Sequence, residues 1–405
     1  MQPDGADGDP AAGRGAGRGG PRPARPSPLS AVLGAVLQAH EPVSRAQIAA
    51  SLGLSRGTVS GIADQLLSAG LVRELDPVLV GRAGRPAVPL AGALGTVAAL
   101  GMEVNVDYSG LRAVDLAGRV LFERVVYEDL RGSDPEVTLG RLADMAGHVI
   151  LELQEAGLRV AGTALALPGL VNRVTGPLRY APNLGWRDVD VVRLMSGHPV
   201  VAAFPPSVAN EANLAARAEA WTRRGRVQPS FFYVSGELGI GGAIVLEGEI
   251  FAGRHGWSGE IGHVVVEPAL GAEHGSLEAR AGQGLMLRAA GMPPGATIAD
   301  LAAAADRGEV QPLTAVRDAG RMLGTALAAA ANILDIGEVV LGGSFGQLFD
   351  HLHREVEVCL QQMVIFAPWS TPAVTRARAG ELPAMVGGAL TVLRSVVDDP
   401  EAWVG

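Results

Sequence analysis

Two segments of this chain repeat one plan of strands and turns, and no other feature constrains the fold as strongly. Residues 97–121 and residues 231–250 each read as strand, small-residue loop, strand, glycine turn and strand, with Gly118 and Gly248 in the turns. A repeated hairpin of this kind predicts two lobes of like topology that face a cleft. From residue 94 onward strands alternate with helical patterns, which indicates an α/β body.

The part of the chain before residue 94 differs in composition and apolar periodicity, and it divides into two segments. Residues 1–28 are rich in Gly, Pro, Ala and Arg without apolar periodicity, so they read as a disordered basic tail. From Leu29 apolar residues recur at helical spacing. We therefore expect a tail (1–28), a small helical domain (29–93) and a two-lobed body (94–405), for which 48% hydrophobic residues supply ample core.

The small domain has the pattern of a helix-turn-helix. Ser44 is placed to cap its second helix, Gln47 follows three residues later as in a capping box, and Gly53 ends that helix. Ser55 is then placed to cap a third helix almost at once. Two short helices joined by a tight glycine turn form the helix-turn-helix unit.

The third helix is the one expected to read DNA, because its first two turns carry small and hydrogen-bonding side chains that allow close approach to base edges. Residues 71–73 and 78–80 read as the two strands of a wing, and the arginines of the glycine-rich stretch that follows suit a narrow minor groove. The residues expected to contact DNA are Ser44, Arg45, Gln47, Ser55, Arg56, Gly57, Thr58, Ser60, Arg82 and Arg85. A helical protein-binding module with a basic linker is the alternative.

The charged residues limit the possible functions. All 33 basic residues are arginine, and the absence of lysine excludes Walker-type phosphate loops and Schiff-base chemistry. Basic residues outnumber acidic ones only within residues 1–93, although the whole chain has a net charge of −9, so a polyanion is expected to bind there.

Cellular location is predicted from what the chain lacks. The single cysteine, Cys359, excludes an internal disulfide and a multi-cysteine metal site. No window near the N-terminus resembles a signal peptide, and no apolar run is long enough to span a membrane. We therefore expect a cytoplasmic protein with no membrane partner.

The body resembles the ROK family, which comprises repressors and sugar kinases with a two-lobed, actin-like fold of the ribonuclease H-like sugar kinase type. The preceding domain resembles the winged helix-turn-helix of the family's repressor branch, including the Gly84-Arg-Pro86 link into the body. The motifs that carry the resemblance occur in family order and are Leu167-Pro-Gly-Leu-Val171, Pro182-Asn-Leu-Gly-Trp186, Asn210-Glu-Ala-Asn213, Gly239-Ile-Gly-Gly242, Gly259-Glu-Ile-Gly-His263, Ser276-Leu-Glu278 and Leu341-Gly-Gly-Ser-Phe345.

The resemblance implies a sugar pocket. Sugar hydroxyls need convergent hydrogen-bond donors and acceptors, and the residues at the matching positions are of that kind. These candidate sugar-binding residues are Asn183, Asn210, Glu211, Glu260, His263 and Glu278. Taken singly, the asparagines also read as turn formers, the carboxylates as surface groups and the histidine as a structural residue.

The chain departs from the kinase members of that family where they hold ATP. Their first phosphate loop reads Asp-x-Gly-x-Thr, whereas this chain has Glu103-Val-Asn-Val-Asp107. Their second reads Gly-Thr-Gly, whereas this chain has Glu237-Leu-Gly239, and their Asn-Asp general base is Asn210-Glu211. Carboxylates in phosphate loops repel phosphate, so we expect no phosphotransfer and assign no catalytic residue.

The chain also departs from the family's common zinc site, which uses one histidine and three cysteines. His263 is followed by residues 264–275 without a cysteine, and His274 cannot complete a four-ligand site. We therefore expect neither a metal nor a cofactor.

Together these features predict a transcriptional regulator, with repression relieved by a sugar as the expected mode. Operator DNA and a sugar or sugar derivative are the expected partners, and a homodimer or homotetramer would match a roughly palindromic operator. One alternative is an active sugar kinase fused to a DNA-binding domain. Another is a regulator whose effector is a phosphosugar, a partner protein or nothing at all.

Overall fold

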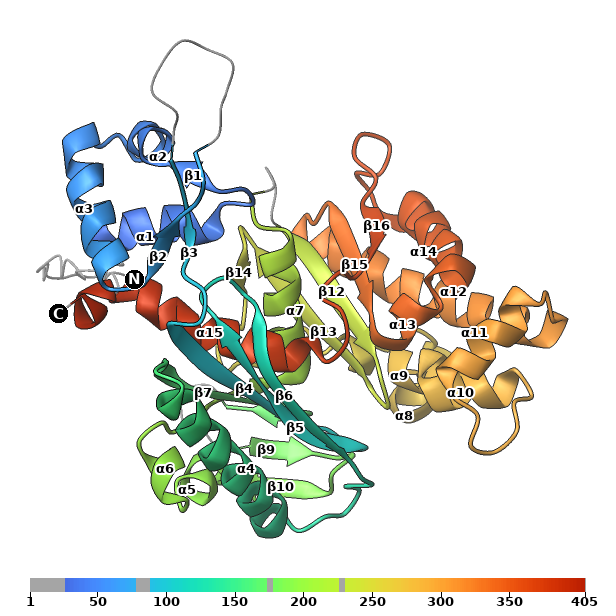
Figure 1. The fold of residues 1–405 in the computed structure, drawn as a ribbon. Helices are drawn as coiled ribbons and strands as arrows, with labels where there is room; N and C mark the ends of the chain where they lie inside the picture. Colours follow the sequence, from blue (N-terminus) through green and yellow to red (C-terminus); the bar gives the residue numbers. More distant parts are fainter. Residues whose placement is uncertain (1–25, 78–87, 173–177, 226–229, 405) are drawn as a thin grey trace, which may run out of the picture.

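The computed structural model describes residues 26–77, 88–172, 178–225 and 230–404. A small N-terminal head rests on two larger lobes (Figure 1). We define the head as three helices and a three-stranded sheet of order β1-β3-β2. Its elements are α1 (Pro28–Gln38), β1 (Val43–Ser44), α2 (Arg45–Leu52), α3 (Arg56–Ser68), β2 (Val72–Glu74) and β3 (Pro89–Gly92). The expected tail lies almost entirely outside the described residues.

The predicted helix boundaries of the head are confirmed by their caps. The Ser44 hydroxyl oxygen accepts a hydrogen bond from the Gln47 N–H (3.3 Å), and the Gln47 side-chain oxygen accepts one from the Ser44 N–H (2.9 Å). Gly53 ends α2 in the left-handed region (φ 66°), which glycine adopts without steric cost. Apolar faces of α1 and α3 are buried in one core cluster, which also takes in residues of β4 and α15.

The wing differs from the sequence prediction. The strand that pairs with β2 is β3, in antiparallel register with Val72 opposite Gly92 and Glu74 opposite Leu90. The basic stretch around Arg82 and Arg85 therefore lies between the two paired strands rather than after them. The predicted second strand at residues 78–80 and both arginines lie outside the described residues.

The first lobe contains a five-stranded sheet of order β11-β7-β4-β5-β6, with α4 on one face. Its strands are β4 (Val97–Val104), β5 (Tyr108–Asp115), β6 (Val120–Tyr127), β7 (Arg159–Leu167) and β11 (Ser207–Asn210). Alternation along β4 decides which side chains face α4, since Leu100 and Met102 join that core while Val97 and Ala99 join the core on the other side. The remaining elements are α4 (Pro135–Glu155), α5 (Val191–Met195), α6 (Pro199–Ala202) and a small sheet of β8 (Leu170–Val171), β9 (Leu178–Ala181) and β10 (Trp186–Val189).

The second lobe contains a five-stranded sheet of order β14-β13-β12-β15-β16. Its strands are β12 (Phe231–Gly236), β13 (Ile240–Leu246), β14 (Glu249–Ile250), β15 (Glu338–Gly342) and β16 (Ala373–Arg376). Its helices are α8 (Gly271–Gly275), α9 (Leu277–Ala281), α10 (Gln283–Ala289), α11 (Ile298–Asp306), α12 (Val310–Leu334), α13 (Gly343–Gln347) and α14 (Phe349–Met363), with 3₁₀ turns η1 (Ile261–His263) and η2 (Pro268–Leu270). Within the described ranges, no helix combines the length and apolar character needed to cross a bilayer.

The two sheets share one topology, which confirms the lobes predicted from the repeated hairpins. In each sheet three consecutive antiparallel strands are followed by two parallel ones, so β4, β5 and β6 correspond to β12, β13 and β14. Gly118 and Gly248 occupy the left-handed region in the turns (φ 81° and 79°), as the pattern required.

Two helices, α7 (Glu211–Thr222) and α15 (Pro383–Asp398), run between the lobes and pack against each other. Their backbones are in such close contact that side chains are excluded. A Cβ atom on Gly101 of β4 would lie 1.7 Å from the Met385 carbonyl oxygen, and one on Gly387 would lie 1.7 Å from the Leu214 carbonyl oxygen. Helix α15 is therefore held against both the first sheet and α7 by glycine.

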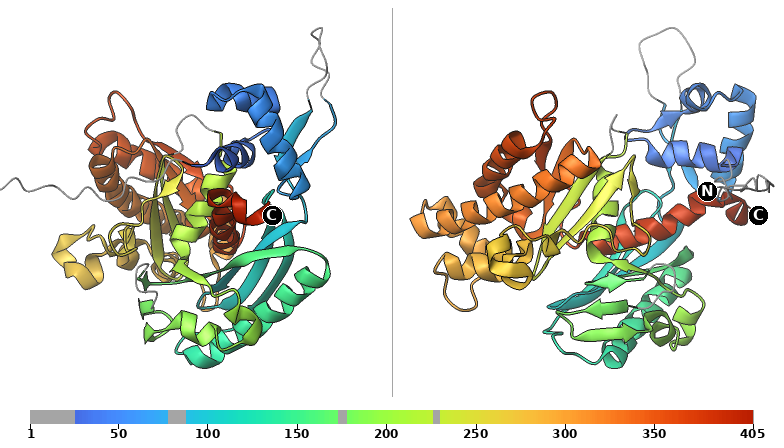
Figure 2. Two further views of the ribbon diagram at one scale, coloured as in Figure 1. Left: turned by 90° about the vertical axis from the view of Figure 1, so that its left-hand side faces the viewer. Right: turned by 180° about the vertical axis from the view of Figure 1, so that it is seen from behind.

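The second half of α15 reaches the head and packs against α1, as the right-hand view of Figure 2 shows. Leu393 and Val396 of α15 belong to the same core cluster as Leu33 and Val36 of α1. The short 3₁₀ turn η3 (Pro400–Trp403) closes the chain against the same region. The head thus shares its core with the body.

A buried ion network fixes α7 to the second sheet. Arg223 donates to Glu219 (2.6 Å) and also to Glu338 at the start of β15. The other Glu219 oxygen accepts the backbone N–H groups of Arg378 (2.7 Å) and Ala379 (2.9 Å), which precede α15. Because each of these charges is paired, the network holds the inter-lobe helices without a buried unpaired ion.

We predict that Gly387→Ala destabilises the protein by about 3 kcal/mol, because the added methyl group meets the backbone of α7, which cannot rotate away. Gly140→Ala is the matched control, since Gly140 lies in the interior of α4 with no atom within 4 Å of an added Cβ. That control should be neutral or stabilising by about 0.5–1 kcal/mol. Urea unfolding of both variants measures the difference, and equal stabilities would contradict the packing argument.

Candidate functional site: a cleft between the lobes and an exposed helix on the head

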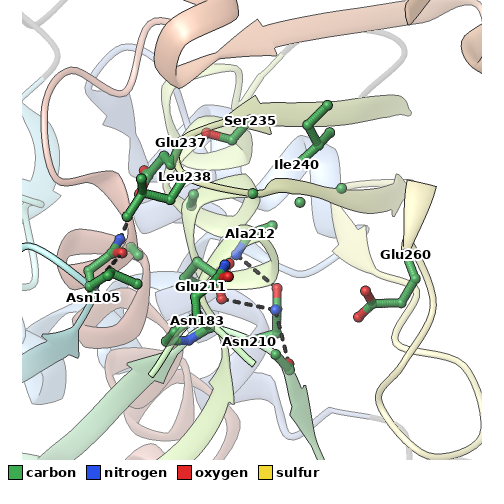
Figure 3. A pocket seen from close by; sticks show the side chains of 18 of the residues that line it. Asn105, Asn183, Asn210, Glu211, Ala212, Ser235, Glu237, Leu238, Ile240 and Glu260 are labelled. Atoms are coloured by element: carbon green, nitrogen blue, oxygen red, sulfur yellow. Dashed lines mark hydrogen bonds between the residues drawn. The ribbon is translucent and has the colours of Figure 1, made fainter. Parts of the chain in front are cut away.

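A cavity of about 390 Å³ lies between the two lobes and receives side chains from both (Figure 3). The structure brings every candidate sugar-binding residue into its lining, although these residues come from loops far apart in sequence. They are Asn183, Asn210, Glu211, Glu260, His263 and Glu278. Their gathering in one cavity is a structural fact, and their role in binding remains a prediction.

Asn210 both caps a helix and faces the cavity. Its side-chain oxygen accepts the Ala212 N–H (2.9 Å) at the start of α7, so the turn-forming role that the residue type allows is present. Its amide nitrogen donates to the Gly169 carbonyl oxygen (3.2 Å) and to a Glu211 carboxylate oxygen (2.9 Å). These bonds fix the orientation of both side chains at the floor of the cavity (Figure 3).

The opposite wall is built around Glu278. One carboxylate oxygen accepts the Ile240 N–H (2.8 Å), and a Cβ on Gly239 would lie 2.7 Å from that same oxygen. The Asn183 amide nitrogen would lie 3.5 Å from that Cβ, which is an ordinary contact, so it is Glu278 whose approach to the strand requires glycine at 239. The sequence marks Gly239 only as part of a phosphate-loop motif, so this steric role has no signal in the sequence.

Glu260 and His263 flank the short η1 turn at the mouth of the cavity. Burial raises the pKa of Glu260, which the charge of His263 opposes and that of Glu278 reinforces. His263 is exposed and reaches the cavity from the end of the turn.

Trp257 is a further lining residue that sequence analysis did not single out. Its indole N–H donates to the Val171 carbonyl oxygen (3.1 Å), which ties the second lobe to the first across the mouth. An aromatic ring beside convergent polar groups is typical of small-molecule sites. The available signal in the sequence was a tryptophan in a glycine-rich stretch just before Glu260.

At the other end of the cleft, the two loops that depart from the kinase pattern are joined directly. The Asn105 amide nitrogen donates to a Glu237 carboxylate oxygen at 2.6 Å, across the gap between the lobes (Figure 3). The same nitrogen lies 3.4 Å from a Glu103 oxygen, which also accepts the Tyr108 hydroxyl at 2.7 Å. Asp107 is exposed beside this group.

The carboxylates at this end raise one another's pKa values. Burial, with the charge of Glu237, raises the pKa of Glu103 to about 8, and the second Glu103 oxygen is buried without a hydrogen-bond partner. Burial also raises the pKa of Glu237, with a further contribution from Asp107. Burial raises the pKa of Glu211 well above its usual range, and Glu237 and Glu103 add to the effect. The cleft is therefore a poor environment for an added anion.

The donor atoms around the cleft do not fit the zinc site that the resemblance implies. In the part of the chain that the structure describes, no group of three or more His, Cys, Asp or Glu residues is arranged to hold a metal ion. His263 and His274 have no cysteine beside them, and structural zinc needs four ligands of nitrogen or sulfur type.

The head presents the first turn of α3 to solvent. Arg56, Gly57 and Thr58 are exposed and Ser60 is half-buried. The Ser55 hydroxyl caps α3 by accepting the Thr58 N–H (3.1 Å), just as Ser44 and Gln47 cap α2, so these predicted DNA contacts already have structural roles.

Arg45 is placed differently from a free DNA contact. Its guanidinium donates to Glu74 (2.6 Å) and Asp64 (3.0 Å), so it ties α2 to β2 and α3. Two of the five N–H donors of this guanidinium are therefore already engaged within the head. Arg82 and Arg85 lie outside the described residues.

Comparison with known protein families gives two matches in chain order. Residues 30–83 match the MarR family, and residues 100–395 match the ROK family. The second match covers most of the chain, and it includes both lobes and the cleft.

The chain is similar to named regulators. It is 28% identical over 228 residues to the xylose repressor of Bacillus subtilis, a match that spans 56% of this chain and only 58% of that repressor. It is 26% identical over 356 residues to the DNA-binding transcriptional dual regulator NagC of Escherichia coli, covering 84% of this chain and 86% of NagC.

Solved structures confirm the predicted fold class. A ROK family transcriptional regulator, described as a homolog of the E. coli MLC protein, superposes with a TM-score of 0.74 at 24% identity, covering 93% of this chain and 98% of that one. A ROK family glucokinase from Streptomyces griseus, in complex with glucose and AMPPNP, superposes with a TM-score of 0.60 at 20% identity, covering 73% and 99%.

The raised pKa of Glu103 predicts a pH-dependent stability. Folded Glu103 keeps its proton up to about pH 8, whereas a glutamate in the unfolded chain ionises near pH 4.5, so folding takes up a proton between these values. Stability should fall as pH rises from about 5 to 8, by up to about 4 kcal/mol relative to Glu103→Gln, which carries no such proton.

Urea unfolding of wild type and Glu103→Gln across this pH range provides the measurement. Glu357→Gln, on the exposed face of α14, is the matched control and should follow the wild-type profile. A constant stability difference between wild type and Glu103→Gln over the whole range would show that Glu103 is already ionised.

Proposed function

The chain belongs to the ROK family, and from that premise we propose that it is a DNA-binding transcriptional regulator that responds to a sugar. The observation that carries this proposal is the combination, in one chain, of an exposed helix-turn-helix and a cavity lined by convergent polar side chains. We take residues 29–93 as the DNA-binding domain and residues 94–405 as the sensing domain. The names of its relatives, a xylose repressor and the NagC regulator, support the same function.

The chemistry of the cavity favours an uncharged sugar over a phosphosugar. Carboxylates and amides such as Glu211, Glu278 and Asn183 can accept from or donate to hydroxyl groups. None of the described residues that line the cavity is an arginine, the only strongly basic residue in this chain. A phosphate would therefore enter a site with several carboxylates and no cation to pair with.

We propose that the chain is not a kinase, because a carboxylate and a hydrogen bond between the lobes stand where the family's kinases hold ATP phosphate. Two like charges about 4 Å apart cost about 4 kcal/mol at an effective dielectric near 20. Glu237 would meet ATP phosphate at that range in the loop where the family's kinases have glycine, and Asn105 already occupies the space between the loops. An active sugar kinase fused to a DNA-binding domain is the second candidate, which the glucokinase likeness keeps open.

A single helix supplies a route from the sugar to the DNA. Pro383 and Ala384, in the first turn of α15, line the cavity, while Leu393 and Val396 pack in the core of the head. A sugar that changes the angle between the lobes would move α15 and the head with it. The ligand can shift this equilibrium only by its differential affinity for the two arrangements, and we propose that it favours release of DNA.

We propose that the protein acts as a homodimer or homotetramer in the cytoplasm, so that two heads meet two operator half-sites. The second lobe exposes large apolar side chains where α12 and α14 end, namely Ile333, Met363, Ile365 and Trp369. Asn332 bridges the two chain segments, since its amide donates to the Met363 carbonyl oxygen and accepts the Ile365 N–H. Such a patch suits a second copy of the chain. A single-chain mass in light scattering would contradict the proposal.

The test of the proposed function is fluorescence anisotropy of the DNA upstream of the protein's own gene, with a panel of hexoses, pentoses and aminosugars at fixed salt. We expect tight binding that one neutral sugar releases. In Glu278→Gln that sugar should bind about tenfold more weakly, since the variant loses a carboxylate acceptor but keeps its shape, and Glu357→Gln should behave as wild type. Sugar-dependent ADP formation by wild type would instead support the kinase.

The assignment of α3 predicts that Arg56→Ala weakens specific DNA binding by about 1–3 kcal/mol, because its side chain is exposed at the start of the helix. Arg317→Ala, an exposed arginine on α12 far from the head, is the control and should leave the affinity unchanged. If both variants bind operator DNA like wild type, α3 does not enter the major groove as proposed.

A further inference from the structure

A second cavity, of about 350 Å³, lies where the head meets the body. It is bounded by α1, by the end of α7, by the turn between β13 and β14, and by the second half of α15 (Figure 1). It is separate from the cleft between the lobes, because that cleft reaches only Pro383 and Ala384 of α15 whereas this cavity begins at Leu390. Six residues of helix correspond to about 9 Å along the axis.

Two of the three arginines that line this cavity are paired with carboxylates. Glu249 is shared by Arg217 (2.9 Å) and Arg394 (2.7 Å), and Arg394 also pairs with Asp398 (3.1 Å). Burial acts to raise the pKa of Glu249, but the hydrogen bonds and charges of the two arginines outweigh it and lower that pKa. Glu247 also lines the cavity, and no ion pair joins it to any of these arginines among the described residues.

Arg224 is the third guanidinium of the lining and has no carboxylate partner in the described part of the chain. It donates to the Trp221 carbonyl oxygen (2.8 Å) and lies with its guanidinium carbon 4.4 Å from the centre of the Trp221 ring. Burial lowers its pKa, and its Nε atom is buried without a hydrogen-bond partner. The Nε atom of Arg217, which lines the same cavity, is in the same condition. Unsatisfied buried donors cost free energy that a bound anion would recover.

The rest of the wall is apolar. The cavity is lined there by Leu37 of α1, by Leu116 of the turn between β5 and β6, and by Leu390, Leu393 and Val397 of α15. A ligand that fits both parts of the wall must combine an anionic group with an apolar body. The first cavity has the opposite character, since carboxylates line it and no arginine does among the described residues.

We propose that this second cavity is a binding site for a small organic anion with an apolar body, whose acidic group pairs with Arg224 and whose body contacts the leucines of α1 and α15. The cavity lies in the size range of small-molecule sites. Its ligand contacts the head through α1 and the body through α7 and α15 at once. The site is independent of the proposed sugar site and of the identity of the sugar.

The test uses 8-anilinonaphthalene-1-sulfonate, which joins a sulfonate to aromatic rings and fluoresces in apolar surroundings, with the full-length protein. We expect saturable binding at one site in wild type, at least tenfold weaker binding in Arg224→Leu, and partial recovery in Arg224→Lys, which keeps the charge. Arg317→Leu removes an exposed arginine on α12 and should leave binding unchanged. Equal affinity of the probe for wild type and Arg224→Leu would overturn the proposal.

Thermal unfolding without the probe tests whether Arg224→Leu loses probe binding only because the variant is less stably folded. Arg224→Leu removes a half-buried guanidinium without a carboxylate partner, so its melting temperature should equal or exceed that of wild type. With saturating probe, wild type should melt at a higher temperature, and the shift of Arg224→Leu should be clearly smaller. An equal shift in both proteins would place the probe elsewhere and would also overturn the proposal.

Discussion

Backbone contact between α15 and its neighbours is the constraint on which the rest of the structure depends. At Gly101 and Gly387 the chain has no side chain because no atom could fit between α15, the first sheet and α7. This contact places the first turn of α15 in the cleft and its second half in the head. The buried network of Arg223, Glu219 and Glu338 holds α7 against the second sheet in turn. The cleft and the head are therefore positioned by the same pair of helices.

The two ends of the cleft differ in their electrostatic character. At one end, Asn183 and Glu278 offer donors and acceptors to hydroxyl groups, and Gly239 leaves room for Glu278. At the other end, buried Glu103 lies near half-buried Glu237, and the amide of Asn105 bridges the lobes between them. The amide donates hydrogen bonds to the carboxylates but does not neutralise their charge. Their mutual repulsion is therefore reduced by protonation, where another protein would use a bound cation.

Local signals in the sequence were reliable where one segment decides its own structure. The caps at Ser44 and Gly53 follow from side-chain and backbone preferences over a few residues, and the repeated hairpins follow from apolar strands with glycine turns. The residues that line the cleft could be predicted only from family motifs, because they come from both lobes and lie far apart in the sequence. The pairing of β2 with β3 was missed because β3 has no alternating pattern and is set by its register with β2. The predicted strand at residues 78–80 lies outside the described residues.

Other features depended on contacts between distant segments and had no local signal. The pairing of Arg45 with Glu74 joins residues 29 positions apart, so the sequence showed only an arginine at the start of a helix. The burial of Glu103 depends on its strand lying in the middle of a sheet beside the second lobe. The second cavity needs α1, α7 and α15 together, and Arg224 in isolation reads as a surface residue.

The shared core of the head and α15 bears on how such a protein can be recombined. The head is not expected to be stable when it is separated from the body, because Leu33 and Val36 would lose their contacts with Leu393 and Val396 and expose an apolar face. A chimera that exchanges DNA specificity must carry α1 and the matching half of α15 together, although the two lie at opposite ends of the chain. Over evolutionary time, a change of operator is thus easier by substitution on the exposed face of α3 than by exchange of whole domains.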